Sequence, residues 1–187
     1  AIEKEAPIWM EAPVAVGSDW LLQGKHQGIN ASLALRAIKI VFPNIDEDAV
    51  NRGVKKAVSW GRFTNLKHNN QTVIIDGAHN VQGLKSLRDN LKRYHNTKSV
   101  SVIFGIHCSK PLHIMIPIIK TLGDTFYYCE FDKTLAHKKE SVSDYFNASL
   151  PLYTLEEDIP ESPLIVITGS IYFIGNFYKT KRAINIF

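Results

Sequence analysis

Cysteine is scarce in this sequence of 187 residues, which contains only Cys108 and Cys129. The two are not at metal-ligand spacing and are too few for a disulfide framework, so we expect free thiols and a cytoplasmic protein. No run of about 18 apolar residues is present, so no membrane-spanning helix is predicted. The first ten residues lack a basic stretch followed by an apolar one, and we therefore expect no secretory signal.

Several common site motifs are also missing. There is no Gly-x-x-x-x-Gly-Lys-Ser/Thr loop for phosphates and no Gly-x-Gly-x-x-Gly turn for dinucleotides. A Gly-x-Ser-x-Gly nucleophile elbow is absent too. The seven histidines do not pair with cysteines or acids at zinc spacing, so we expect no metal site on this chain.

What is present is an ordinary globular composition, with 45% hydrophobic and 21% charged residues. Lysine and arginine number 22 against 18 acids, a formal net charge of +4. Such a charge is compatible with an anionic ligand or with weak nucleic-acid contact, and also with a solvated basic surface that binds nothing. Charge alone therefore identifies no partner, and the length fits one domain with a real core.

The first part of the chain reads as a leading segment followed by two helices. Residues 1–25 contain two prolines and two glycines and are expected to be linker-like. Apolar residues then recur at helical spacing up to Val41, and Asn30 is a candidate N-cap for that helix. A second helix is predicted from Asp46 to about Val58. We treat residues 26–187 as one α/β domain.

From residue 72 onward, short apolar strands alternate with amphipathic helices. The pattern predicts a Rossmann-like α/β fold, a mostly parallel sheet with helices on both faces. Predicted strands cover 72–76, 99–105, 125–131 and 163–169, with a short one at 151–155, and predicted helices cover 81–95, 111–123, 138–147 and 170–179.

Polar residues and glycines follow three of these strands. In open parallel sheets, ligands bind beyond the carboxyl ends of the strands, so the topology is expected to bring these residues to one edge. A helix amino terminus there would offer backbone N–H groups to an anion. The alternative is that Asp76 and Ser170 merely cap the helices that follow them. The three groups are Asp76 with His79 and Asn80, Gly105 with His107, and Thr168 with Gly169 and Ser170.

Four segments resemble one family of enzymes. They read GKHQGINA at 24–31, SWGRF at 59–63, IDGAHN at 75–80 and TGSIY at 168–172. In this order they are similar to motifs of folylpolyglutamate and dihydrofolate synthases, members of the Mur ligase superfamily. The resemblance covers roughly residues 20–175 and indicates the carboxy-terminal domain of such an enzyme.

The resemblance implies an ATP-dependent ligase that adds L-glutamate to dihydropteroate or folate through an acyl phosphate, in folate biosynthesis and polyglutamylation. In that family a larger amino-terminal domain holds the P-loop and the Mg²⁺ ligands. We therefore expect residues 1–25 to lead in from a missing amino-terminal domain, and the isolated chain to be inactive. ATP, L-glutamate, the pterin substrate and the P-loop domain are the expected partners of a monomer, with no nucleic acid and no membrane.

By matching position, the resemblance assigns Asn30, Arg62 and Asp76 to ATP. It places His79 and Ser170 near the incoming glutamate or the γ-phosphate. A guanidinium suits phosphate oxygens, and a carboxylate at a strand end can accept bonds from ribose hydroxyls. His79 is the catalytic candidate, since it could orient the amine or receive its proton. The alternative for His79 is a fixed hydrogen bond that rigidifies its turn.

The chain departs from the family pattern at two places. Trp60 stands where the family has proline, and residues 105–110 read GIHCSK where the family commonly has Asp-Lys-Asp. Two other functions therefore stay open at this point. One is a cell-wall Mur ligase domain, which shares the fold, and the other is a nucleotide-binding module without catalysis.

Overall fold

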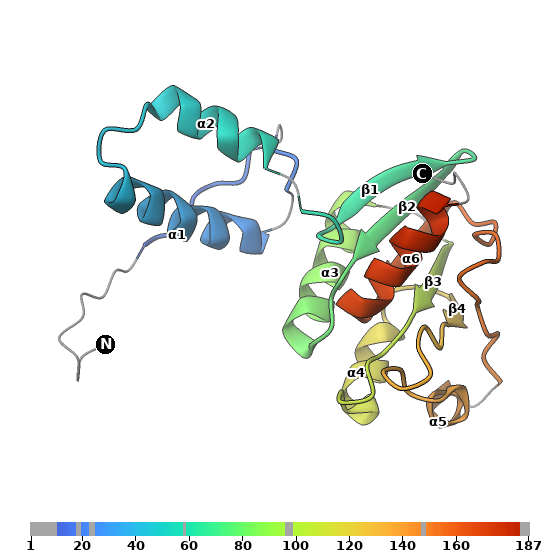
Figure 1. Cartoon of the computed structure of the whole chain (residues 1–187). Coiled ribbons are helices and arrows are strands. Elements are labelled where there is room, and N and C mark those ends of the chain that lie inside the picture. The colour runs from blue at the N-terminus through green and yellow to red at the C-terminus, as the bar shows by residue number, and fades with distance from the viewer. Residues whose placement is uncertain are drawn as a thin grey trace, which may run out of the picture. The chain divides into compact units, whose positions relative to one another are not determined.

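The computed structural model divides the chain into two compact units, Ala1–Val58 and Ser59–Phe187. Much of the predicted leading segment 1–25 lies outside the described residues, and its assignment to a missing domain stays a prediction. None of the described helices is long and apolar enough to cross a membrane. Figure 1 gives the order of the elements. The residues described are 11–17, 20–22, 25–57, 59–95, 99–146 and 149–183.

The first unit contains helices α1 (Lys25–Val41) and α2 (Glu47–Lys56). Asp46 caps α2 as predicted, accepting bonds from the N–H groups of Asp48 and Ala49. The predicted N-cap role of Asn30 is wrong, because α1 begins five residues earlier and places Asn30 inside the helix. Gly28 lies inside this longer helix, and a Cβ there would lie 2.3 Å from the carbonyl oxygen of Val14. The helix therefore includes a glycine that lets the preceding chain pass against it.

The second unit is built on a five-stranded sheet of order β1-β2-β5-β3-β4. All neighbouring pairs are parallel except β1 with β2, so the predicted mostly parallel sheet is confirmed. The strand β1 was not predicted. It forms a hairpin with β2 through Asn69 and Asn70, whose φ angles of 45° and 64° suit asparagine at a tight turn. The strands are β1 (Thr64–His68), β2 (Gln71–Asp76), β3 (Val100–Phe104), β4 (Thr125–Tyr128) and β5 (Leu164–Thr168).

Helices cover both faces of this sheet, as predicted. Consecutive strand residues point to opposite faces, so Ile74 belongs to one apolar cluster and Ile75 to the other. Helices α3 (Val81–Tyr94) and α4 (Leu112–Ile119) pack on the first face, while α6 (Ile171–Ala183) packs on the second (Figure 1). Each strand of the centre is thereby covered on both sides, which explains its continuous apolar run.

Two weaker predictions came out differently. The helix expected at 138–147 is short, with α5 at Lys139–Ser143 followed by one 3₁₀ turn, η2, at Asp144–Phe146. The strand expected at 151–155 is reduced to an isolated bridge between Leu152 and Tyr128. The segment after η2 therefore runs beside the sheet edge without forming a sixth strand.

Candidate functional site

The carboxyl ends of the three central strands meet at one edge of the sheet. Asp76 of β2 is the register partner of Thr168 of β5, which in turn pairs with Phe104 of β3. The turns that follow these strands are therefore neighbours, although they are up to about a hundred residues apart in sequence. This is the edge at which the sequence predicted a site.

Asp76 is buried at this edge, and its carboxylate connects two backbone segments. Its Oδ2 accepts a bond from the backbone N–H of Phe63 at 2.9 Å, and its Oδ1 accepts one from Ala78 at 2.8 Å. Burial raises the pKa of Asp76 to about 6, while these two N–H bonds and the charges of Arg62 and His79 oppose the rise. Asp76 does not cap α3, since that role belongs to Asn80.

The loop that precedes β1 is hydrogen-bonded to the turn that follows Asp76. Gly61 has a φ of 72° and its carbonyl oxygen accepts the N–H of Gly77 at 2.7 Å. Arg62 stands exposed on this loop, between the fastened Gly61 and the buried Phe63. The loop thus presents a guanidinium from a fixed backbone, beside the carboxylate of Asp76.

His79 is half-buried in the turn after β2. Its Nδ1 lies 2.8 Å from the carbonyl oxygen of Gly77. A carbonyl can only accept, so Nδ1 carries the proton, and in the neutral ring Nε2 has the lone pair. The bond to Gly77 fixes the orientation of the ring, which agrees with the turn-rigidifying alternative. It also leaves a basic nitrogen on the opposite side of the ring.

The turn after β5 packs tightly on its neighbours. Gly169 has a φ of 109°, and a Cβ there would lie 2.5 Å from the carbonyl oxygen of Gly105. The N–H of Gly169 donates to Ala78 at 3.1 Å, which joins this turn to the one carrying His79. Ser170 is buried and caps α6, its Oγ lying 3.5 Å from the N–H of Phe173. The structure thus brings Arg62, Asp76, His79 and Ser170 to one edge.

Known proteins are similar to this chain in sequence and in fold. The chain is 29% identical over 174 residues to the dihydrofolate synthase/folylpolyglutamate synthase of Bacillus subtilis, covering 86% of this chain and 40% of that protein. The chain is therefore similar in sequence to folylpolyglutamate and dihydrofolate synthases. No protein-family model matches it. The chain spans about 40% of the length of this relative, so most of that protein lies outside the match.

Solved structures of folylpolyglutamate synthases have the same fold. The folylpolyglutamate synthase of Mycobacterium tuberculosis complexed with ADP and AMPPCP superposes with a TM-score of 0.73 and 23% identity, over 86% of this chain and 41% of that one. Escherichia coli FolC in complex with DHPP and ADP gives a TM-score of 0.76 and 18% identity, over 89% of this chain and 41% of that one. The fold is the one found in the carboxy-terminal domain of these synthases.

Two departures from the family pattern can now be placed. Trp60 packs on Tyr178 of α6, with ring centroids 4.9 Å apart, so an aromatic contact holds the loop where the family has proline. In the loop after β3, the ring of His107 lies 5.5 Å from that of Tyr172, at the rim of the same edge. The sequence motif contained Tyr172, but no function was predicted for it. Its position in the first turn of α6, directly after the central strand β5, could have indicated that it lies at this edge.

Asn30 is the predicted site residue that lies elsewhere. It belongs to the first unit, where it is exposed and its Nδ2 donates to Gln27 at 3.1 Å. Its contact with ATP stays a prediction. Within the described ranges, no three His, Cys, Asp or Glu side chains gather as a metal site would require. The expectation that the magnesium ligands lie outside this chain stays a prediction.

Proposed function

We propose that this chain is the carboxy-terminal part of an ATP-dependent ligase that joins L-glutamate to dihydropteroate or to a folate. The observation that carries the proposal is the junction of two turns. The Asp-Gly-Ala-His turn and the Thr-Gly-Ser turn meet through the bond from Gly169 to Ala78. Both turns belong to motifs of the family, and the relatives in sequence and structure are named as folate ligases.

The chemistry proceeds in two steps. A carboxylate oxygen of the pterin substrate attacks the γ-phosphorus of ATP, and ADP leaves. The amine nitrogen of glutamate then attacks the carbonyl carbon of the acyl phosphate, and phosphate leaves as the amide forms. The amine must lose a proton in this second step, and a basic nitrogen nearby would receive it.

Arg62 is assigned to the phosphates of ATP, because a fixed loop presents its planar fork to solvent. Asp76 already accepts two backbone N–H bonds and is 8% exposed. Its contribution to ATP binding is therefore mainly to hold the loop that carries Arg62. Asn30, in the first unit, is also assigned to the nucleotide.

His79 and Ser170 are assigned to the incoming glutamate. The Nε2 of His79 carries the lone pair that could take the amine proton, because Nδ1 is engaged with Gly77. Ser170 lies at the start of α6, where backbone N–H groups favour a carboxylate. The P-loop and the magnesium ligands belong to the rest of the ligase, so the isolated chain has no cradle for phosphoryl transfer.

The test uses the native gene product that contains this chain. It is incubated with MgATP, L-glutamate and either dihydropteroate or a reduced folate, and ADP release and product mass are measured. We expect ADP release that needs both acceptor and glutamate, and a product heavier by one glutamyl residue. The purified 187-residue chain should give neither. Turnover of a nucleotide-linked muramyl acceptor instead would indicate a cell-wall ligase, and nucleotide binding without ligation would indicate a module.

The role of His79 is tested by His79→Asn, which keeps a side-chain N–H near Gly77 but removes Nε2. We expect kcat to fall by about 10²–10⁴ with the KM for ATP unchanged. The matched control is His113→Asn on the exposed surface of α4, which should leave kcat unchanged. Full activity of His79→Asn would assign His79 to the rigidity of its turn alone.

A further inference from the structure

A buried hydroxyl at the edge of the site has no hydrogen-bond partner. Thr168 is the last residue of β5 and is fully buried, and its Oγ1 is unpaired among the described residues. Buried polar side chains are normally hydrogen-bonded, because water cannot reach them to replace a missing partner. The hydroxyl of Thr168 therefore needs an acceptor close to it.

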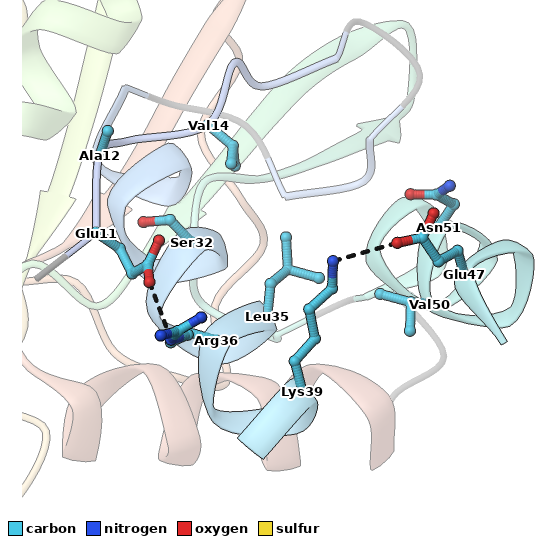
Figure 2. Close-up of a pocket in the computed structure, with 10 residues that line it drawn as sticks. All are labelled: Glu11, Ala12, Val14, Ser32, Leu35, Arg36, Lys39, Glu47, Val50 and Asn51. Carbon is cyan, nitrogen blue, oxygen red and sulfur yellow. Dashed lines mark hydrogen bonds and ion pairs between the residues drawn. The ribbon is translucent and has the colours of Figure 1, made fainter. Parts of the chain in front are cut away.

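Charged side chains of the first unit show the usual pairing. In its pocket of about 330 Å³, Arg36 pairs with Glu11 at 3.1 Å (Figure 2). Lys39 of the same pocket pairs with Glu47 at 3.3 Å. These groups are partly exposed and still have partners, so an unpaired hydroxyl at a fully buried position requires a physical account.

The two strands beside β5 decide which acceptors lie next to this hydroxyl. Asp76 of β2 and Phe104 of β3 are the register partners of Thr168. Ile74 and Val166, two residues earlier on their strands, belong to the same apolar cluster as Phe104. Because side chains alternate along a strand, Asp76 and Thr168 point to this same face, about 4.8 Å apart across the sheet. The ring of Phe104 offers no acceptor there, whereas the carboxylate of Asp76 does.

The carboxylate of Asp76 can accept a third hydrogen bond. Each carboxylate oxygen has two acceptor sites, and here Oδ2 accepts one bond from Phe63 and Oδ1 accepts one from Ala78. Burial raises the pKa of Asp76 to about 6, although the charges of Arg62 and His79 already favour the ionised form. A further donor would stabilise this buried anion.

We propose that Thr168 is a positioning residue, whose hydroxyl donates to the ionised carboxylate of Asp76 and thereby steadies the loop that carries Arg62. Rotation about the Cα–Cβ bond moves the hydroxyl between staggered positions without moving the backbone. The contact joins β5 to the loop before β1 through a single carboxylate. The consequence for ATP rests on the proposed function, in which Arg62 contacts the phosphates.

Protonation of Asp76 reverses this effect. A neutral carboxyl is a weaker acceptor for the N–H of Phe63 and for the hydroxyl of Thr168, so the loop loosens as the pH falls through the pKa of Asp76. Removal of the hydroxyl takes away a bond that favours the charged form, and the pKa of Asp76 then rises. The loop loosens at a higher pH as a result.

The first experiment measures the pKa of Asp76 in the 187-residue chain, from the NMR shift of its carboxyl carbon between pH 4 and pH 8. Thr168→Val keeps the shape of threonine and removes the hydroxyl, and it should raise the pKa by about one unit. Thr168→Ser keeps a hydroxyl and should hold the pKa near that of the parent chain. Thr125→Val, at an exposed position of β4, is the matched control and should change nothing.

The second experiment measures the Kd for ATP of the native gene product over the same pH range. We expect the pH below which binding weakens to move upward by about one unit in Thr168→Val, with the Kd at pH 8 close to that of the parent. Thr168→Ser should restore the parent profile. This KM-independent readout separates a change in the ionisation of Asp76 from a general loss of stability, which would weaken binding at every pH.

The outcomes separate this proposal from the proposed function. An unchanged pKa of Asp76 in Thr168→Val overturns the contact, and so does an equal rise in Thr168→Ser, which would point to packing instead of the hydroxyl. A raised pKa without a shift in the ATP profile overturns the link to the loop of Arg62. A product that shows both shifts but ligates no glutamate supports the role of Thr168 and contradicts the ligase.

Discussion

The two units of this chain bury opposite kinds of side chain. The second unit encloses two apolar clusters, one on each face of its sheet, with residues such as Phe104 and Ile165 fully buried. The first unit buries Gln27 and Ser32 and exposes Leu33. Burial of apolar surface is the main term that stabilises a fold. The second unit therefore has an apolar core of its own, whereas the described residues of the first unit enclose none.

The largest expected effect is that of Phe104→Ala in the second unit. Phe104 is fully buried and packs on Tyr128 and Phe146, so the variant should lose about 3–5 kcal/mol of unfolding free energy. Leu33→Ala in the first unit should change the unfolding free energy of the 187-residue chain by less than about 0.5 kcal/mol. Urea titration followed by circular dichroism measures both. A large loss for Leu33→Ala would contradict the contrast between the units.

The second expected effect is a pH dependence of the unfolding free energy that arises in the second unit. Burial raises the pKa of Asp76 from 3.8 to about 6, so between these values the folded state keeps a proton that the unfolded state releases. Stability from this residue is therefore fully present below about pH 4 and is lost as pH rises through 6. A shift of about two pKa units corresponds to about 3 kcal/mol.

Urea titrations at pH 4 and pH 7 measure this effect as the difference between the parent chain and Asp76→Asn. The variant cannot ionise, so its stability should lack this component of the pH dependence. Taking this difference cancels the contributions of other carboxyls to the pH dependence. Glu130 is one of them, and it acts in the opposite direction because its bond to Lys138 lowers its pKa. Equal pH dependence in both proteins would show that Asp76 does not titrate with a raised pKa.

The sequence predicted those parts of the fold in which buried apolar residues recur regularly along an element. The spacing of apolar residues alone predicts strands such as β2 and β5 and the helix α3. The strand β1 does not, because Leu66 is the only apolar residue among TNLKH. Its available signal was Asn69-Asn70, a pair suited to a hairpin turn.

The sequence predicted which residues lie at the site, but it did not predict how they contact one another. Topology alone brings Asp76, His79 and Ser170 to one edge, once parallel strands are assumed. The partner of Asp76 could not be foreseen, since Phe63 is thirteen residues away and its contact depends on how the loop of Arg62 folds back. Asn30 was misplaced as a cap because the helical spacing of apolar residues in α1 does not indicate where the helix begins.

The third prediction compares two glycines. Gly169 has a φ of 109° and no room for a Cβ, so Gly169→Ala should cost about 2 kcal/mol. Gly53 lies inside α2 with nothing within 4 Å of a Cβ, so Gly53→Ala should stabilise α2 by about 0.5–1 kcal/mol. Thermal unfolding measures the first, and the helical signal near 222 nm the second. A stabilising Gly169→Ala would show that the junction between the turns is looser than described.

The smallest effect comes from removing one helix cap in each unit. Asn80 caps α3 through a bond from Gly83 at 2.8 Å, and Asp46 caps α2 through bonds from Asp48 and Ala49. Each alanine variant should weaken its helix by about 1 kcal/mol. Because α3 is part of a cluster that unfolds as a whole, Asn80→Ala should shift the urea midpoint of the second unit.

Asp46→Ala should leave that midpoint unchanged and speed hydrogen exchange only within α2, since no buried apolar residue is described in the first unit. Peptide-resolved hydrogen exchange on both variants makes the comparison directly. If Asp46→Ala moved the midpoint of the second unit as far as Asn80→Ala does, the units would unfold together.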